Sequence, residues 1–395
     1  MAAIPASRRR RLRRLQPGPE AASLMAMDDR SAAGTPQPLL DLASNDYLGL
    51  SRHPAVVGAA QAAAAREGTG AGASRLVSGS RPVHHALESA LAQWLGRERV
   101  LLFPSGFQAN LAAVSALADR HTLVLADRLI HASLLTGVRA SGARLQRFAH
   151  NDLAALDRRL QAARRTTPQR RLLVLSESLF SMEGTSPEMP ALAALCARHG
   201  AALLLDEAHA LGVLGRGGRG LGHGEPSIAL ISGTFGKAFG SGGAFLAGDA
   251  LVGDWLLQSS GPFRYTTALA PPLAAGALAA LQLLQEAEAA GGHPGAALLA
   301  RAGRWRDRLE AAGWPRPPGR GPVLSLQVGD DGRSLALQQR LEQAGLLVVA
   351  IRPPTVPEGA ARLRLVLRHD LPSGSLERLL EALGSPAALP LSTLP

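Results

Sequence analysis

Apolar residues follow two different periods along most of the chain. Short, near-continuous apolar runs, as at 172–176 and 202–205, are typical of strands that are covered on both faces of a sheet. Segments between them, such as 189–199, carry apolar residues at helical spacing, which predicts helices that pack on such a sheet. The repeated alternation of the two patterns predicts an α/β fold with a mostly parallel central sheet and helices on both faces.

The same patterns predict how the elements follow one another along the chain. We expect strands at 39–42, 100–103, 122–126, 144–148, 172–176, 202–205 and 243–247, and helices at 55–66, 83–95, 108–117, 132–141, 152–163 and 189–199, before a long helical region that ends near 290. Helices at 296–312, 334–344 and 373–383 and strands at 323–328, 346–350 and 362–367 then predict a small C-terminal α/β lobe.

The predicted elements divide the chain into three parts. Residues 1–38 are rich in Pro, Arg and Ala and predict an N-terminal arm of one or two short helices. We expect residues 39–290 to form a large domain and residues 291–395 a small one. A chain of 395 residues exceeds the size at which single hydrophobic cores stop growing, so this division is expected.

The net charge of +11 raises the question of an anionic partner. Nucleic acid is one candidate, but the only dense cationic cluster, residues 8–14, lacks interleaved aromatic residues, and the other arginines are scattered. A basic surface that attracts an anionic, phosphate-bearing small substrate explains the charge equally well. We therefore expect no nucleic-acid partner.

Other sequence features bear on the compartment. The most apolar long segment, 268–284, is interrupted by Pro271 and Pro272, so no membrane-spanning helix is predicted. The N-terminal segment has no apolar stretch of the kind found in secretory signals, although a transit peptide stays an alternative. Cys196 is the only cysteine and is predicted to be a small core residue. We expect a cytoplasmic protein.

Lys237 is the only lysine among 42 lysines and arginines, and it lies in the Gly-rich segment 232–243. A lysine amine can lose its proton when desolvated and attack a carbonyl as a Schiff-base nucleophile, whereas arginine stays protonated. Chance survival of one lysine is the alternative, but a chance survivor is expected on a helix surface rather than between glycines. Lys237 is therefore a candidate catalytic residue.

Further polar groups follow the predicted strands, and ligands of open α/β sheets bind beyond the carboxyl ends of strands. Gly106 and Phe107 begin a helix, where free amides favour a phosphate, although glycine also serves ordinary turns. Asp206 ends a buried strand and could hold a proton on a ring nitrogen, or cap a helix. His131 could stack on a ring or move a proton, and a structural histidine is the alternative.

Residues 206–209 also spell the DEAH box of helicase ATPases. That function requires a phosphate-binding loop of the form G-x-x-x-x-G-K-[ST], but Ile231 occupies its first glycine position and Ala238 follows Lys237. The ATPase hypothesis therefore fails. A phosphate site, a strand-end carboxylate, an imidazole and a nucleophilic lysine are together what pyridoxal phosphate requires.

At this point the sequence resembles a known family, the α-oxoamine synthases among the fold type I pyridoxal-phosphate enzymes. The resemblance is carried by motifs along nearly the whole chain: Ser44-Asn45-Asp46-Tyr47-Leu48-Gly49-Leu50, Ser74-Arg75-Leu76-Val77-Ser78-Gly79, His131-Ala132-Ser133-Leu134, Phe180-Ser181-Met182-Glu183-Gly184, Asp206-Glu207-Ala208-His209 and Thr234-Phe235-Gly236-Lys237. One departure is Ile130, where many members have Ser, and we expect no loss of function from it. The family implies a decarboxylating C-acyltransferase that joins an amino acid to an acyl thioester, usually as a homodimer.

The resemblance implies roles for individual residues. Lys237 would hold the aldehyde of the cofactor and act with Asp206 and His131 in catalysis. Asp206 would keep the ring nitrogen protonated, and His131 would stack on the ring. The remaining implied cofactor contacts are His209, Ser181, Thr234, Gly106 and Phe107, and the implied substrate contacts are Arg13, His131, Arg352 and Thr355; Arg352 as a surface cation and Ser181 as a turn residue are the alternatives. No metal site is expected.

The segment 351–357, Ile-Arg-Pro-Pro-Thr-Val-Pro, distinguishes branches of the family. It resembles the branch that joins L-alanine to a pimeloyl group carried by coenzyme A or an acyl-carrier protein, in biotin synthesis. Sister enzymes that use glycine or serine, namely glycine C-acetyltransferase, 5-aminolevulinate synthase and serine palmitoyltransferase, are the first alternative. A non-catalytic, basic nucleic-acid-binding protein is the second.

Overall fold

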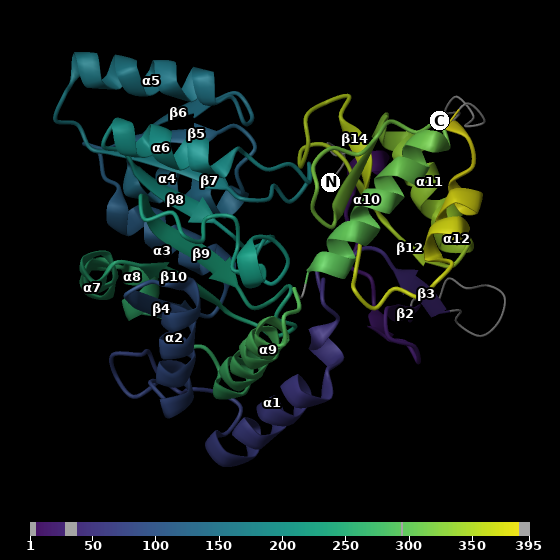
Figure 1. Ribbon diagram of the computed structural model, residues 1–395, viewed down its shortest axis with the longest axis horizontal. Helices are drawn as coiled ribbons and strands as arrows, with labels where there is room; N and C mark the ends of the chain where they lie inside the picture. The colour runs from purple at the N-terminus through teal and green to yellow at the C-terminus, as the bar shows by residue number, and fades with distance from the viewer. Residues whose placement is uncertain (1–4, 28–37, 294, 387–395) are drawn as a thin grey trace. The chain divides into compact units, whose positions relative to one another are not determined.

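The computed structural model describes residues 5–27, 38–293 and 295–386. Its contacts divide the chain into two compact units (Figure 1). The larger unit comprises Leu50–Phe180 and Ser186–Gly295, and the smaller comprises Met1–Gly49, Ser181–Thr185 and Ala296–Pro395. Across the described residues, no helix has the length and apolar character that a membrane span requires.

The larger unit is built on a seven-stranded sheet with the order β4-β10-β9-β8-β7-β5-β6. Its strands are β4 (Arg99–Phe103), β5 (Leu123–Asp127), β6 (Arg144–Phe148), β7 (Leu172–Glu177), β8 (Ala202–Asp206), β9 (Ile228–Thr234) and β10 (Ala244–Gly248). The strands from β9 to β6 run parallel, and only β10 is antiparallel to its neighbours. The predicted, mostly parallel central sheet is therefore confirmed.

Helices cover both faces of this sheet (Figure 1). The helices of the larger unit are α1 (Pro54–Glu67), α2 (Pro82–Leu95), α3 (Gly106–Leu117), α4 (Ala132–Ser141), α5 (Leu153–Thr166), α6 (Met189–Arg198), α7 (Ala250–Ser259), α8 (Gly261–Arg264) and α9 (Pro271–Ala289), of which α1 packs on α9 rather than on the sheet. The chain crosses from β5 to β6 in one direction and returns toward β8, so right-handed crossovers place α4 on one face and α5 and α6 on the other. Buried Ala112, Val114 and Leu134 join α3 and α4 to the strands.

The smaller unit contains two small sheets, β1-β2-β3-β12 and β11-β14-β13. Its strands are β1 (Leu15–Pro17), β2 (Ser23–Ala26), β3 (Pro38–Asp41), β11 (Val323–Gly329), β12 (Leu346–Leu347), β13 (Val349–Ile351) and β14 (Ala361–Val366), and its helices are α10 (Ala296–Ala311), α11 (Asp331–Gln343) and α12 (Ser375–Leu383). The C-terminal part thus has the predicted α/β character.

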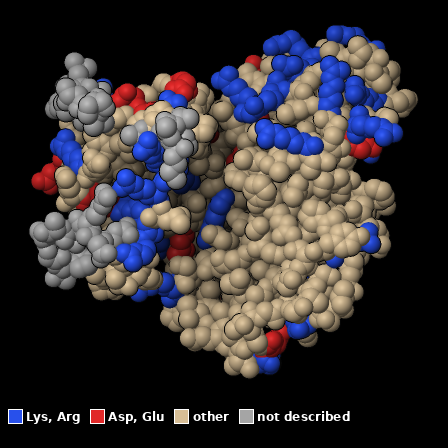
Figure 2. Space-filling model, turned by 180° about the vertical axis from the view of Figure 1, so that it is seen from behind, with Lys and Arg blue, Asp and Glu red and all other residues tan. Residues whose placement is uncertain are grey.

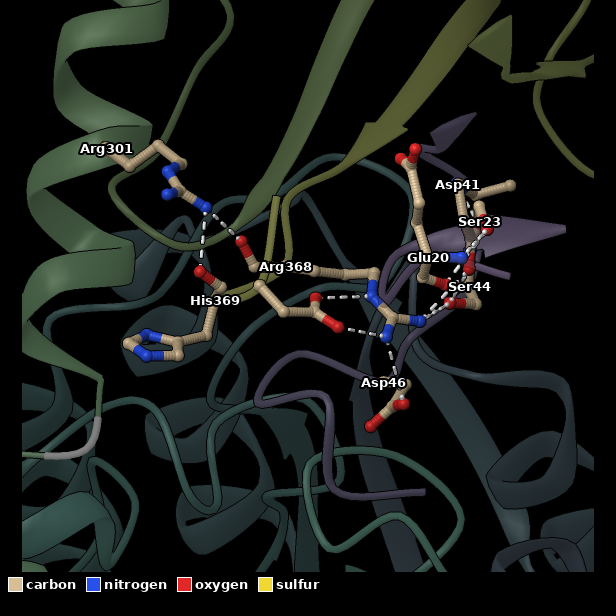
Figure 3. A network of polar contacts seen from close by, with 10 residues as sticks. Glu20, Ser23, Asp41, Ser44, Asp46, Arg301, Arg368 and His369 are labelled. Carbon is tan, nitrogen blue, oxygen red and sulfur yellow. Dashed lines mark hydrogen bonds and ion pairs between the residues drawn. The ribbon is translucent and has the colours of Figure 1, made fainter. Parts of the chain in front are cut away.

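Buried charges hold the smaller unit together around Arg368, which is 7% exposed (Figure 3). Its guanidinium donates to both oxygens of Asp370, at 2.9 and 2.7 Å, and to Asp41 Oδ2 at 3.1 Å. It also lies 3.4 Å from Asp46 Oδ2. Asp41 ends β3 and Asp46 belongs to the Ser-Asn-Asp-Tyr motif that follows, so Arg368 fixes that turn beside the end of β14.

Several elements differ from the sequence prediction. The predicted helical arm instead contains a one-turn 3₁₀ helix at Ala6–Arg8 and the strands β1 and β2, which pair with each other; β2 also pairs with β3, and residues 28–37 lie outside the described residues. The strand predicted at 39–42 pairs with β12 and not with the large sheet. The strand predicted at 346–350 divides into β12 and β13, which belong to different sheets.

Candidate active site

Five strands of the larger unit end at one edge of the sheet, and the predicted chemistry lies there. β5, β7, β8 and β9 are parallel. Ala244 of β10 pairs with both Phe103 of β4 and Thr234 of β9, so β4 and β9 end at the same level. The turns that follow the five strands contain Gly106, His131, Ser178, His209 and Lys237.

Lys237 lies in a tight turn after β9 whose backbone is fixed on both sides. Its carbonyl accepts a hydrogen bond from the Gly240 amide at 2.9 Å. Phe235 and Phe239 flank it, are fully buried and place their ring centroids 5.5 Å apart. Gly240 has a φ of +59°, and a Cβ there would lie 2.2 Å from the Ser51 nitrogen. Gly240 therefore has a structural reason, and the two buried phenylalanines anchor the turn that contains Lys237.

The first turn of α3 has the properties of an anion site. Ser105 Oγ accepts a hydrogen bond from the Gln108 amide at 3.3 Å and caps the helix. Within the described structure, the amides of Gly106 and Phe107 donate to no other protein group. A Cβ on Gly106 would lie 3.7 Å from the Cβ of Thr234. Free amides at a helix N-terminus beside a threonine suit a phosphate.

Thr234 also has a local structural role. Its hydroxyl donates to the Gly243 carbonyl at 3.0 Å and accepts from the Gly236 amide at 3.2 Å. These bonds close the base of the Lys237 turn. Its predicted contact with the cofactor phosphate stays a prediction.

Asp206 is buried at the end of β8, with 6% of its surface exposed. Its Oδ1 accepts from the Ala208 amide at 2.9 Å, and its Oδ2 accepts from Asn110 Nδ2 at 2.7 Å. The first bond stabilises the turn after β8, a described segment in which no helix begins, so it is not the helix cap that was the alternative. The second fixes the carboxylate from a different element, and both oxygens keep capacity for another donor.

His131 precedes α4 and is held by polar contacts on its Nδ1 side. Nδ1 lies 2.7 Å from Ser133 Oγ, and the His131 amide donates to Glu177 Oε1 at 2.6 Å. Loss of water around the ring lowers the pKa of His131; the Asp206 charge opposes this effect and the Lys237 charge adds to it. These electrostatic contributions place His131, Asp206 and Lys237 within range of one another.

Asn110 and Ser133 are site residues that the sequence analysis missed. Asn110 Nδ2 donates to Ser133 Oγ at 2.9 Å as well as to Asp206, so it joins the strand-end carboxylate to the imidazole. Asn110 is the one polar residue among the buried residues of α3, which are otherwise Ala and Val. That break in the apolar pattern is the signal that could have found it.

The remaining predicted cofactor contacts fall in different units. His209 is buried in the turn after β8, three residues after Asp206. Ser181 belongs to the smaller unit, where its carbonyl accepts from Arg364 Nε at 2.6 Å. Arg364 also donates to Asn45 Oδ1 at 2.9 Å. The sequence analysis gave Arg364 no role, although a charged residue in a fully buried strand is a signal.

The predicted substrate residues also lie in the smaller unit. Arg352 is 8% exposed and donates to the Ser7 carbonyl, and Thr355 Oγ1 accepts from Arg10 at 3.2 Å. Arg13 is ion-paired with Glu342. Arg352 is therefore not the ordinary surface cation that was its alternative, and the N-terminal segment lies along 352–355. The substrate roles of Arg13, Arg352 and Thr355 stay predictions.

Glu207 is a fully buried carboxyl group directly after Asp206. It accepts from the Gly222 amide at 2.6 Å and from the Leu221 amide at 3.2 Å. A Cβ on Gly220 would lie 2.6 Å from its carboxyl carbon. Glu207 thus holds the glycine-rich segment against the end of β8. Burial raises its pKa from the ordinary 4.5 to about 7.

We predict that Glu207→Gln changes how stability depends on pH. In the folded chain Glu207 binds its proton more tightly than in the unfolded chain, so its contribution is complete below pH 4.5 and is lost as pH rises through about 7. Glutamine does not titrate, so the variant does not lose stability in this way as pH rises. Its Tm relative to wild type should therefore rise between pH 5 and pH 8, measured by thermal unfolding. The exposed Glu377→Gln serves as control, and parallel curves for wild type and Glu207→Gln would contradict the assignment.

Comparison with known proteins places the chain in a family. The model of aminotransferase class I and II matches residues 37–383. The chain belongs to the aminotransferase class I and II family. Within this family, an 8-amino-7-oxononanoate synthase from Chromohalobacter salexigens is 45% identical over 88% of this chain and 89% of its own. The Pseudomonas syringae pv. tomato enzyme of that name is 44% identical over 88% of this chain and 86% of its own.

Solved structures agree with this assignment. A lysine-to-alanine variant of a serine palmitoyltransferase from S. paucimobilis, with a bound pyridoxal-phosphate–myriocin aldimine, has a TM-score of 0.86 at 26% identity, over 94% of this chain and 91% of that one. An 8-amino-7-oxononanoate synthase from Francisella tularensis has a TM-score of 0.72 at 26% identity, over 87% and 96%. The resemblance to α-oxoamine synthases, the fold class and the prediction of an enzyme are confirmed.

Proposed function

We propose that this protein is an 8-amino-7-oxononanoate synthase that acts in biotin synthesis. It joins L-alanine to the acyl carbon of a pimeloyl thioester, releases the thiol and carbon dioxide, and forms 8-amino-7-oxononanoate. The observation that carries the proposal is identity of 44–45% to synthases of this name over nearly the whole chain. The arrangement of lysine, carboxylate and helix N-terminus at one sheet edge suits this chemistry.

Pyridoxal phosphate fits the residues that are present. The free amides of Gly106 and Phe107 suit its phosphate, and the Asp206 carboxylate, already oriented by two donors, suits a protonated ring nitrogen. The cofactor, when bound, supplies an electron sink for negative charge at the Cα of alanine. Lys237 would hold the cofactor, and His131 and His209 would line its ring.

The residues of the chain would move and hold the protons of the reaction. Lys237 removes the Cα proton of alanine and later returns a proton to the same carbon. Asp206 holds the proton on the ring nitrogen throughout. The Cα–acyl bond forms as the carbon–sulfur bond breaks, and loss of the alanine carboxylate as carbon dioxide follows. Arg13, Arg352 and Thr355 of the smaller unit would contact the substrate.

The acyl donor is anionic, whether coenzyme A or a carrier protein presents it. Between residues 120 and 171 the chain has eleven arginines and only three acidic residues. These arginines are scattered in the sequence but gather over the β6 and α5 part of the larger unit (Figure 2). Such a surface would raise the local concentration of an anionic donor.

The exposed apolar residues of the larger unit support a homodimer. The single buried thiol is compatible with the cytoplasm. Large apolar side chains stay exposed on the larger unit: Phe107 in the first turn of α3, Leu76 and Val77 in the loop after α1, Tyr265 after α8 and Leu273 in α9. A partner subunit would cover them. Cys196 is buried, and burial raises its pKa to about 12, so it has the predicted core role.

The test is product analysis with a panel of substrates. The purified protein, loaded with pyridoxal phosphate, is given alanine, glycine or serine with acetyl, succinyl, pimeloyl or palmitoyl thioesters, and products are identified by mass spectrometry. We expect 8-amino-7-oxononanoate from alanine and a pimeloyl thioester, with the highest kcat/KM of all pairs. A higher kcat/KM for glycine or serine with another thioester would replace the proposal by a sister synthase.

A further inference from the structure

Asn110 and Ser133 connect two residues of the candidate site through buried hydrogen bonds. Asn110 on α3 donates from Nδ2 to Asp206 Oδ2 at 2.7 Å and to Ser133 Oγ at 2.9 Å. The Ser133 hydroxyl in turn lies 2.7 Å from His131 Nδ1. Asn110 is 3% exposed and Ser133 is fully buried, so bulk water does not compete for these bonds.

The chemistry of these groups determines where each proton lies. A carboxylate oxygen only accepts hydrogen bonds, so Asn110 must turn its NH₂ group toward Asp206. Its Oδ1 is buried with no hydrogen-bond partner among the described residues, which indicates that the NH₂ contacts set the orientation. The same NH₂ group makes Ser133 Oγ an acceptor, so the hydroxyl proton is directed at His131 Nδ1.

The backbone of Ser133 adds a second donor to the same ring nitrogen. Its amide lies 3.3 Å from His131 Nδ1. A nitrogen that accepts two hydrogen bonds carries no proton itself, so the neutral imidazole has its proton on Nε2. The direction of the pKa shift of His131, which is lowered by burial, agrees with a neutral ring.

We propose that Asn110 and Ser133 are positioning residues that act as one unit: they fix the Asp206 carboxylate and hold His131 as the neutral tautomer with its proton on Nε2. Asp206 ends β8 and His131 follows β5, and these strands are separated by β7. The side-chain bonds therefore couple two groups that the backbone does not join directly. The proposal rests on the proposed function only in that Asp206 and His131 contact the cofactor there.

The test compares Ser133→Ala with a matched control on the same helix. Ser141 also lies on α4, but its hydroxyl donates to the Val138 carbonyl at 2.8 Å and makes no hydrogen bond to Asn110, Ser133 or His131 within the described structure. The ring nitrogens of ¹⁵N-histidine in the full-length chain, freed of cofactor, are followed by NMR during a pH titration, with His131→Asn to assign the signal. Wild type and Ser141→Ala should show His131 as the Nε2–H tautomer.

In Ser133→Ala we expect a mixture of the two tautomers and a His131 pKa that moves up toward its ordinary value, because the neutral form loses a donor at Nδ1. Loaded with cofactor, this variant should lose about tenfold in kcat, the effect of one hydrogen bond, with KM nearly unchanged. A wild-type tautomer and pKa in Ser133→Ala would overturn the proposal.

A second variant tests the other end of the network. Asn110→Ala removes the donor to both Asp206 and Ser133, so the Ser133 hydroxyl is free to turn away and the same mixture of His131 tautomers is expected. Retention of the wild-type His131 signal in Asn110→Ala would also count against the coupling. The NMR measurement needs no substrate, so the network can stand if the substrate panel refutes the proposed reaction, and it can fail while that reaction is observed.

Discussion

Lys237→Arg is expected to remove turnover, with kcat reduced by at least about 10⁴-fold, while the chain stays folded. General base catalysis alone contributes up to about 10⁴-fold. Lys237 is proposed to hold the cofactor as well, and a guanidinium can do neither because it stays protonated. The substitution keeps the positive charge, and the turn is fixed by Phe235, Phe239 and Gly240 rather than by the lysine side chain.

The measurement is steady-state kcat with alanine and a pimeloyl thioester, together with borohydride reduction and peptide mapping. Wild type should yield a cofactor adduct on the peptide that contains Lys237, and the variant should yield none. Comparable Tm values for the two proteins are the control for folding. Turnover by Lys237→Arg within about tenfold of wild type would refute the role of the lysine, since no other lysine exists in the chain to replace it.

Asp206→Asn is the second large effect, and we expect kcat/KM to fall by about 10²- to 10³-fold. A neutral amide no longer favours a proton on the cofactor ring nitrogen, and a charge-assisted bond is lost. An amide also presents an NH₂ group where the carboxylate now accepts from both Asn110 and the Ala208 amide. Asp206→Glu, which keeps the charge, should retain more activity than Asp206→Asn.

Asp127 offers a matched control for this prediction. It too is a fully buried carboxylate at the end of a parallel strand, and it accepts from the amides of Leu129 and Asn151 at 2.8 and 2.7 Å. Asp127→Asn should lower Tm but leave kcat/KM of the folded protein within a few-fold. If the two asparagine variants lost activity equally, Asp206 would be a structural residue only.

The alternation of strands and helices in the larger unit could be predicted because each element has its own apolar period. Strand β9 was not predicted. Its last residues are Ser, Gly and Thr, and it runs directly into the glycine-rich turn that contains Lys237, so its apolar pattern is short. β3 was predicted as a strand, but its partner was not, since pairing with β12 joins residues about 300 positions apart. The local sequence pattern thus predicts that a segment is a strand better than it predicts the strand with which that segment pairs.

The candidate site likewise contains some residues that the sequence identifies and others that only the fold identifies. Lys237, Asp206 and His131 carry functional groups whose chemistry is visible in the sequence. Asn110 and Ser133 act through contacts to those residues across different elements, so only the fold shows that they meet. Arg352 was predicted as a substrate contact, but its burial against the N-terminal segment depends on tertiary packing.

Ala244 has a consequence for how this site could change in evolution or design. One residue of β10 lies opposite both Phe103 and Thr234, so the strand ends that lead to the anion-binding amides and to Lys237 share a single register. The distance between these two strand ends is set by the spacing of the strands in the sheet and not by the length of the loops. One inserted residue in β10 would therefore turn its side chains to the other face and shift the two halves of the candidate site against each other.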